Sequence, residues 1–184
     1  MKKVAVLLAD GFEEIEALTV VDILRRAEVQ CDMVSIGEIN VIGGHNIKVT
    51  ADMRIDEDLS SYDMVVLPGG IPGATNLQAN TKVIELVRNF YSNNKFVAAI
   101  CAAPIVLKTA GIIEGKNITS YPGYEDELEG GNNIDTENVV VDGNIITSRG
   151  PATSMLFAYK ILEVLGNDKH ESLSEGMMFN FLMR

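Results

Sequence analysis

The 184-residue sequence has little cysteine and little histidine, two residues of each. Cys31 and Cys101 do not form a disulfide framework, so we expect the protein to work in the reducing cytoplasm. His45 and His170 lack the spacing of a metal-binding motif, and the sequence therefore predicts no metal site. The basic start runs through a short apolar stretch directly into acidic residues, without a cleavage site, so we interpret it as a strand and not a signal peptide.

Basic charge and long apolar runs are also scarce. Lys and Arg number 15 against 26 Asp and Glu, a formal net charge of −11 that disfavours nucleic acid and anionic membranes as partners. No apolar run approaches the roughly 20 residues that span a bilayer. The Gly-Lys-Ser/Thr ending of a phosphate loop is missing, and we expect no bound cofactor. The length predicts a single domain over residues 1–184.

Apolar runs alternate with helical patterns along the chain. The patterns predict strands, alone or in hairpins, over residues 2–9, 29–37, 40–49, 62–70, 96–100 and 139–150. They predict helices over residues 13–27, 75–94, 103–111, 152–166 and 172–184. The last hairpin is expected to turn at Asp142-Gly143, which suits a type I′ turn. This alternation predicts an α/β fold with a mostly parallel sheet and helices on both faces.

Cys101 stands where the strand pattern "FVAAI" gives way to the helical pattern "APIVLKTAG". In parallel sheets, ligands bind outside the carboxyl ends of the strands, which is where this residue falls. A thiol at the first turn of a helix feels the positive end of the helix dipole, so we expect a lowered pKa. A sharp turn would present the sulfur as a nucleophile elbow. The alternative is a buried structural cysteine, which is our interpretation of Cys31 inside a strand.

Glu16 is an acidic residue on an apolar helix face. At about 100° per residue, it falls in the arc of Ala17 and Val20, whereas Glu14 falls on the opposite, wet face. Burying a carboxylate is costly, so an inward-facing Glu16 needs a reason beyond complementing the helix dipole. We expect Glu16 and Cys101 to titrate together, with the proton on the carboxyl.

The glycines of "LPGGIPGA" belong to the same edge of the predicted sheet. Gly69 and Gly70 permit a close approach of the backbone, and their N–H groups are candidates for facing an oxyanion. The alternative is that they only turn the chain.

Four stretches, "ADGFEEIEALTVVDILRRA", "YDMVVLPGG", "AAICAAP" and "TSRGPATS", resemble the ThiJ/PfpI superfamily and most closely its branch of the Parkinsonism-associated deglycase. The resemblance extends from Ala9 to Ser154 and implies a flavodoxin-like three-layer sandwich and a homodimer. It also implies a nucleophile at Cys101 and a protonated partner at Glu16, with backbone donors at Gly69 and Gly70. Members are described as redox-responsive chaperones, as glutathione-independent glyoxalases and as protein or nucleotide deglycases.

Two departures from the family pattern bear on the chemistry. Peptidase-like and amidotransferase-like relatives carry a histidine directly after the cysteine, where this chain has Ala102. The deglycase branch often has a His-Pro step where this chain has Tyr121 before Pro122, and tyrosine is a poor base near neutral pH. His45 corresponds to a position that approaches the site from the other subunit in some relatives, although a solvated turn histidine is the simpler interpretation.

The residues and the resemblance together predict a cysteine-dependent enzyme. Its substrate would be a small 2-oxoaldehyde such as methylglyoxal, or an early protein adduct of one. Cys101 would add to the aldehyde, Glu16 would move protons, and N–H groups of Gly70 and Ala102 would hold the oxyanion. The alternative is a redox sensor or stress chaperone in which Cys101 is oxidised to sulfinate without turnover.

Further residues are expected around the site and at a subunit interface. Tyr121, Arg149, Pro151 and His45 are candidates for lining the site. Ile15 and Leu18 interrupt the wet face of the first helix, which suits a twofold homodimer formed through this helix close to Glu16.

Overall fold

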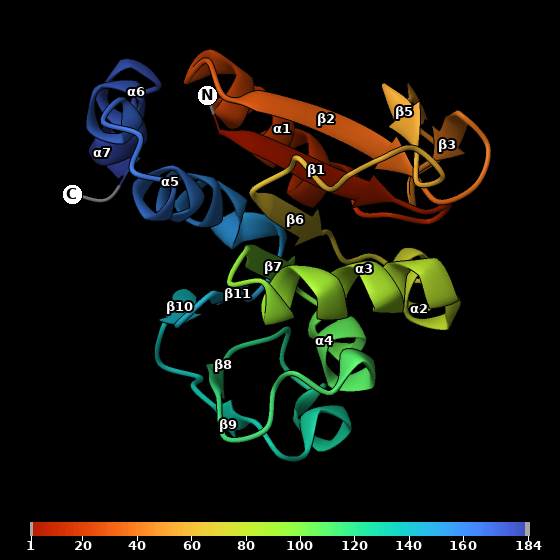
Figure 1. Ribbon diagram of the computed structural model, residues 1–184. Helices are drawn as coiled ribbons and strands as arrows, with labels where there is room; N and C mark the ends of the chain where they lie inside the picture. Colours follow the sequence, from red (N-terminus) through yellow and green to blue (C-terminus); the bar gives the residue numbers. More distant parts are fainter. Residues whose placement is uncertain (1, 183–184) are drawn as a thin grey trace.

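A seven-stranded sheet forms the centre of the protein, as the computed structural model of residues 2–182 shows (Figure 1). Its strands are β1 (Lys3–Leu8), β2 (Gln30–Ser35), β5 (Met53–Arg54), β6 (Met64–Leu67), β7 (Phe96–Ile100), β10 (Val139–Asp142) and β11 (Ile145–Ser148). Their order is β10-β11-β7-β6-β1-β2-β5, and all neighbours are parallel except β10 and β11. The succession β2-β1-β6-β7-β11 is the flavodoxin order. The predicted fold class is therefore confirmed.

Helices cover both faces of this sheet, as the sequence predicts (Figure 1). One layer contains α1 (Glu14–Arg26) and α5 (Ser154–Val164), and the other contains α2 (Gly73–Ala79), α3 (Thr81–Ser92) and α4 (Pro104–Ala110). Each face encloses its own hydrophobic core, because successive strand side chains point to opposite faces. Along β1, Val4, Val6 and Leu8 pack under α1 and α5, whereas Ala5 and Leu7 pack under the other layer.

The helix predicted over residues 75–94 is two helices, α2 and α3, so this prediction is wrong at Asn80. The backbone there is extended, with φ −86 and ψ 114, and the side-chain oxygen accepts hydrogen bonds from the N–H groups of Lys82 and Val83. An asparagine that caps a new helix start offers the backbone an alternative to continuous helical bonding. The break between α2 and α3 follows from that local competition.

The predicted C-terminal helix is also divided, into α6 (His170–Gly176) and α7 (Phe179–Leu182). Met178 between them has a φ of +62, a left-handed conformation that interrupts a right-handed helix. The last two residues of the predicted helix, 183 and 184, lie outside the described residues.

The remaining short strands and helices lie outside the seven-stranded sheet. They are the hairpin of β3 (Asn40–Ile42) and β4 (Lys48–Thr50), the parallel pair β8 (Asn117–Ile118) and β9 (Asn132–Asn133), and the short helices η1 (Glu125–Leu128) and η2 (Pro151–Thr153). Both predicted hairpins are present. The β10–β11 hairpin turns one residue later than predicted, because Asp142 still pairs with Ile145. Its loop is Gly143-Asn144 with φ +62 at Gly143, which is the glycine-first pattern of a type II′ turn.

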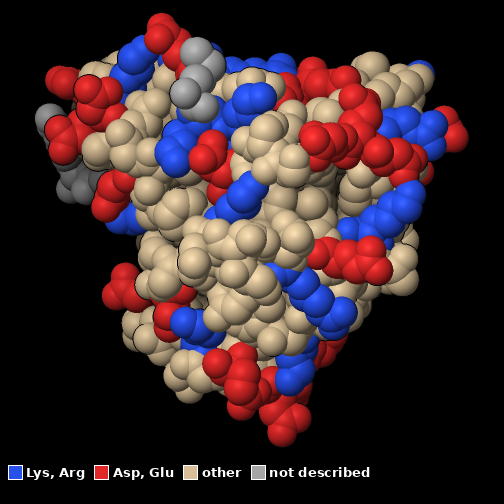
Figure 2. Space-filling model, in the orientation of Figure 1, with Lys and Arg blue, Asp and Glu red and all other residues tan. Residues whose placement is uncertain are grey.

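Charged side chains are spread over the surface. On the face shown in Figure 2, Asp and Glu lie mainly around the edges, and a largely uncharged region crosses the middle. Within residues 2–182, no helix is both long enough and apolar enough to cross a bilayer.

Candidate active site

Cys101 follows directly after β7 and occupies a strained turn. Its φ is +65, a left-handed conformation that costs free energy for a residue other than glycine. The Cys101 N–H donates to the carbonyl oxygen of Ser148 at 3.0 Å, which ties the turn to the end of β11. Helix α4 begins at Pro104, so Cys101 precedes the helix and does not lie in its first turn. The sharp strand-to-helix turn predicted from the sequence is nevertheless present.

Glu16 projects from α1 into the core and is 0% exposed, in the direction predicted by its helical position. The Gly69 N–H donates to Oε2 at 2.7 Å. No N–H or O–H group of the described residues reaches Oε1. Burial raises the pKa of Glu16 to about 7, although hydrogen bonds from Cys101 and Gly69 act in the opposite direction. This carboxyl is therefore able both to hold and to release a proton near neutral pH.

The ionisation of Cys101 depends on Glu16. Burial raises the pKa of the Cys101 thiol to about 12, and the charge of an ionised Glu16 adds to the rise, while N–H groups of Ala102 and Gly70 oppose it. The lowered pKa predicted from the helix dipole is therefore wrong for a thiol beside an ionised carboxylate, since α4 begins only at Pro104. A proton on Glu16 removes the repulsion, so the site favours one negative charge shared by the pair.

The glycine pair after β6 serves two different purposes. A Cβ on Gly69 would lie 2.7 Å from Cys101 Cβ and 2.8 Å from Glu16 Oε2, so only glycine fits there. Its N–H is engaged by Glu16, which removes Gly69 from the predicted set of oxyanion donors. Gly70, with φ +85, and Ala102 are the residues whose N–H groups act on the Cys101 sulfur.

Of the four residues predicted to line the site, only Tyr121 forms a hydrogen bond with Cys101 among residues 2–182. Its N–H donates to the Cys101 carbonyl oxygen at 2.9 Å, and its half-exposed ring lies against Gly150. The Arg149 guanidinium instead donates to the Asp135 carbonyl oxygen. Pro151 begins η2 and lines a hollow beside α1.

Tyr124 is a residue that the charge of Cys101 affects and that sequence reasoning missed. It is half-buried and packs against the core under α4, just before η1. Burial raises the pKa of Tyr124, and the charges of Glu127 and Cys101 add to the rise. The only signal in the sequence is that Tyr124 closes the same "YPGY" segment as Tyr121.

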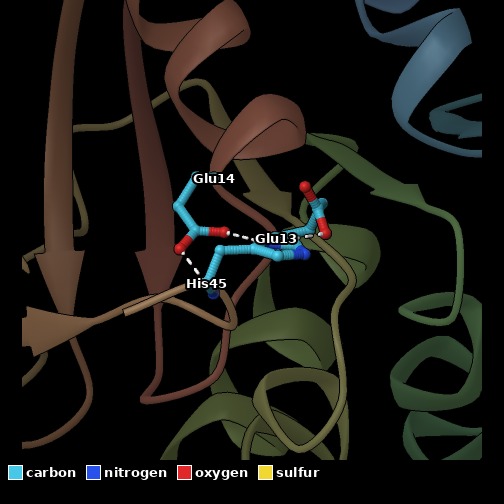
Figure 3. Close-up of side chains that lie close together, drawn as sticks. All are labelled: Glu13, Glu14 and His45. Atoms are coloured by element: carbon cyan, nitrogen blue, oxygen red, sulfur yellow. Dashed lines mark hydrogen bonds and ion pairs between the residues drawn. The ribbon is translucent and has the colours of Figure 1, made fainter. Parts of the chain in front are cut away.

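Glu14 is buried, with 5% exposure, so its predicted place on the wet face is wrong. The β3–β4 hairpin covers it: the His45 N–H donates to Oε1 at 2.8 Å, and His45 Nδ1 lies 2.8 Å from Oε2 (Figure 3). Glu13 Oε2 lies 3.8 Å from the same nitrogen. The His45 ring is 68% exposed yet paired with Glu14 of its own chain.

Cys31 lies in β2 and is 2% exposed. Burial raises the pKa of its thiol to about 12, so the interpretation as a packing cysteine agrees with its surroundings.

The sequence is similar to known proteins of one family. The model of the DJ-1/PfpI family matches residues 2–164. Protein dj-1beta of Drosophila melanogaster is 39% identical over 186 residues, covering 96% of this chain and 97% of that protein. The glutathione-independent glyoxalase DJ-1 of Schizosaccharomyces pombe is 34% identical, covering 96% and 98%. Protein DJ-1 homolog B of Arabidopsis thaliana is 37% identical, and the chain spans 41% of that longer protein.

Solved structures agree with these similarities. The crystal structure of Drosophila melanogaster DJ-1beta superposes with a TM-score of 0.92 at 38% identity, covering 97% of this chain and 98% of that one. The structure described as Toxoplasma gondii DJ-1, oxidized, gives 0.88 at 31% identity, covering 97% and 98%.

We predict that Glu16→Gln removes a pH dependence of stability between about pH 4.5 and pH 7. The native carboxyl keeps its proton up to about pH 7, whereas the unfolded carboxyl releases it near 4.5. The unfolded state thus binds fewer protons in this window, so the free energy of unfolding falls as pH rises. The shift corresponds to a loss of about 3 kcal/mol. Urea unfolding across this range measures it.

The matched control for this measurement is Glu163→Gln, which changes an exposed glutamate on α5. It should keep the slope of the natural chain. An unchanged slope in Glu16→Gln would show that this carboxyl is not held protonated.

Proposed function

The chain belongs to the DJ-1/PfpI family, and from this membership and its site we propose that it is a cysteine-dependent enzyme acting on small 2-oxoaldehydes such as methylglyoxal, or on their early protein adducts, without glutathione. The observation that carries the proposal is the pairing of Cys101, at a strained turn, with a buried carboxyl whose pKa is about 7. The Schizosaccharomyces pombe relative named a glutathione-independent glyoxalase supports it. The cytoplasm, where unpaired cysteines persist, is the proposed compartment.

The first step forms a carbon–sulfur bond. As the sulfur attacks the aldehyde carbon, ionised Glu16 takes the thiol proton. The aldehyde oxygen becomes an oxyanion that accepts hydrogen bonds from the N–H groups of Gly70 and Ala102. Glu16 then returns its proton to this oxygen, which gives a hemithioacetal on Cys101.

The next steps move a proton between carbons. Ionised Glu16 removes the proton from the former aldehyde carbon, which leaves an enediolate with its charge on the neighbouring oxygen. That oxygen takes the proton of the adjacent hydroxyl, and Glu16 returns its own proton to the neighbouring carbon. The product is a thioester of a 2-hydroxy acid. Water adds to this thioester and releases the acid, which regenerates the Cys101 thiol. A pKa of about 7 suits Glu16 to both directions of proton transfer.

We expect lactate to form from methylglyoxal without glutathione, and Cys101→Ser and Glu16→Gln each to lower kcat/KM at least about 100-fold. Cys101→Ser removes the nucleophile, and Glu16→Gln removes the group that transfers protons. The assay is lactate produced by the full chain, with folding checked by circular dichroism. The matched control is Cys31→Ala, which removes the other cysteine and should keep turnover. Full turnover in either Cys101→Ser or Glu16→Gln would refute the mechanism.

A second candidate function is redox sensing without turnover. Protonated Glu16 can donate a hydrogen bond to an oxygen atom bound to the Cys101 sulfur. The N–H groups of Gly70 and Ala102 face the sulfur itself. Two equivalents of hydrogen peroxide would convert the thiol to sulfinic acid and release two molecules of water. The Toxoplasma gondii relative whose structure is described as oxidized supports this candidate.

Mild peroxide should add two oxygens to the natural chain and none at this position in Cys101→Ser, as measured by intact mass. In Glu16→Gln the sulfinate loses a carboxyl donor, so we expect oxidation there to stop short or to continue to the sulfonate. A natural chain that gains no oxygen at Cys101 would argue against sensing.

We also propose a twofold homodimer formed through α1. Ile15 is 55% exposed and Leu18 is half-buried, and both line a hollow of about 460 Å³ together with Pro151 and Met155. An apolar hollow of this kind beside Glu16 suits a symmetry-related copy of the same helix.

Sedimentation at micromolar concentration should give the mass of a dimer for the natural chain and of a monomer for Ile15→Glu, because the new charge would be buried at the interface. Val141→Glu, a change at an exposed apolar residue of the edge strand β10, is the control and should remain dimeric. A monomeric natural chain would exclude the dimer at these concentrations.

A further inference from the structure

Three side chains with metal-ligating atoms meet where the β3–β4 hairpin crosses the start of α1 (Figure 3). Ligand atoms of Glu13, Glu14 and His45 all lie within 4.8 Å of one another. His45 Nδ1 lies 2.8 Å from Glu14 Oε2 and 3.8 Å from Glu13 Oε2. Ligands on a tetrahedral Zn²⁺ are about 3.3 Å apart, from bond lengths of about 2.0–2.1 Å. The two separations bracket that value.

Glu14 is held as a ligating carboxylate usually is. Its Oε1 accepts the His45 backbone N–H at 2.8 Å, which leaves Oε2 facing the imidazole. A Cβ at Gly43 would collide with this carboxyl, so the glycine is what lets the hairpin close over it. Outer hydrogen bonds of this type fix the orientation of metal ligands. Glu14 is 5% exposed, so its carboxylate is held in one orientation by the protein around it.

Glu13 adds a second carboxylate at the same point. Its backbone is anchored, because its N–H donates to the Gly69 carbonyl oxygen at 2.9 Å. Its side chain is only 15% exposed, and among residues 2–182 the cation nearest to it is the His45 ring at 3.8 Å. A divalent cation at this point would be attracted by two carboxylates at once.

We propose that Glu13, Glu14 and His45 bind a divalent transition-metal cation, with Zn²⁺ as the best match. One imidazole nitrogen and two carboxylate oxygens suit Zn²⁺, whereas Mg²⁺ and Ca²⁺ prefer ligand sets made only of oxygen. Three protein ligands leave a fourth position for water or a small molecule. The site uses neither Cys101 nor Glu16, so it is a second site beyond the proposed enzymatic one.

Calorimetric titration of Zn²⁺ into the full chain, freed of metal by a chelator and carrying Cys101→Ser, tests the site without thiolate ligation. We expect one Zn²⁺ per chain. His45→Ala and Glu13→Gln should each weaken binding at least about tenfold. His170→Ala removes the only other histidine and should leave the affinity unchanged. Because the Cys101→Ser background has no nucleophile, the result is independent of whether the chain turns over aldehydes.

Thermal unfolding provides a second readout. Zn²⁺ should raise the midpoint of the Cys101→Ser chain and leave that of the Cys101→Ser, His45→Ala chain unchanged, because the ion would link the hairpin to α1 only through the intact ligand set. His45 is largely exposed, so its replacement should not impair folding. Absence of binding at millimolar Zn²⁺, or equal affinity with and without His45, would overturn the proposal.

Discussion

The hydrogen bond from the Gly69 N–H to Glu16 is the contact on which the rest of the site depends. It joins the first helix to the turn that follows β6, through a carboxyl that is 0% exposed. A buried carboxyl resists ionisation, which is why the pKa of Glu16 rises to about 7. This buried carboxyl lies beside Cys101, so the ionisation of the thiol depends on the charge of Glu16.

Backbone conformation positions the other parts. Gly11 and Gly70 each have φ +85, and Cys101 has φ +65, so three turns after neighbouring strands adopt left-handed geometry at one edge of the sheet. These turns contact one another closely: a Cβ on Gly70 would collide with the backbone of Gly11 and Glu13. Parallel strands bring their carboxyl ends together, and small residues at those ends let the loops approach closely enough to share hydrogen bonds.

Much of the fold was predictable because it follows from local periodicity. Alternating apolar strands and amphipathic helices specify a covered parallel sheet, and the helical position of Glu16 correctly predicts that it faces inward. The predictions that failed concern competition or distant neighbours. Asn80 ends one helix by capping the next, and Glu14 is buried because a hairpin some thirty residues later covers it.

The sheet, the layers, the turn at Cys101 and the inward direction of Glu16 can be read from the sequence alone, since each rests on residue type and spacing within one element. Four features appear only after folding: the charge of the thiol, the role of Gly69 as a donor to Glu16, the effect of Cys101 on Tyr124, and the meeting of Glu13 and Glu14 with His45. Burial and electrostatic interaction depend on which atoms face each other after folding, and no single segment contains that information.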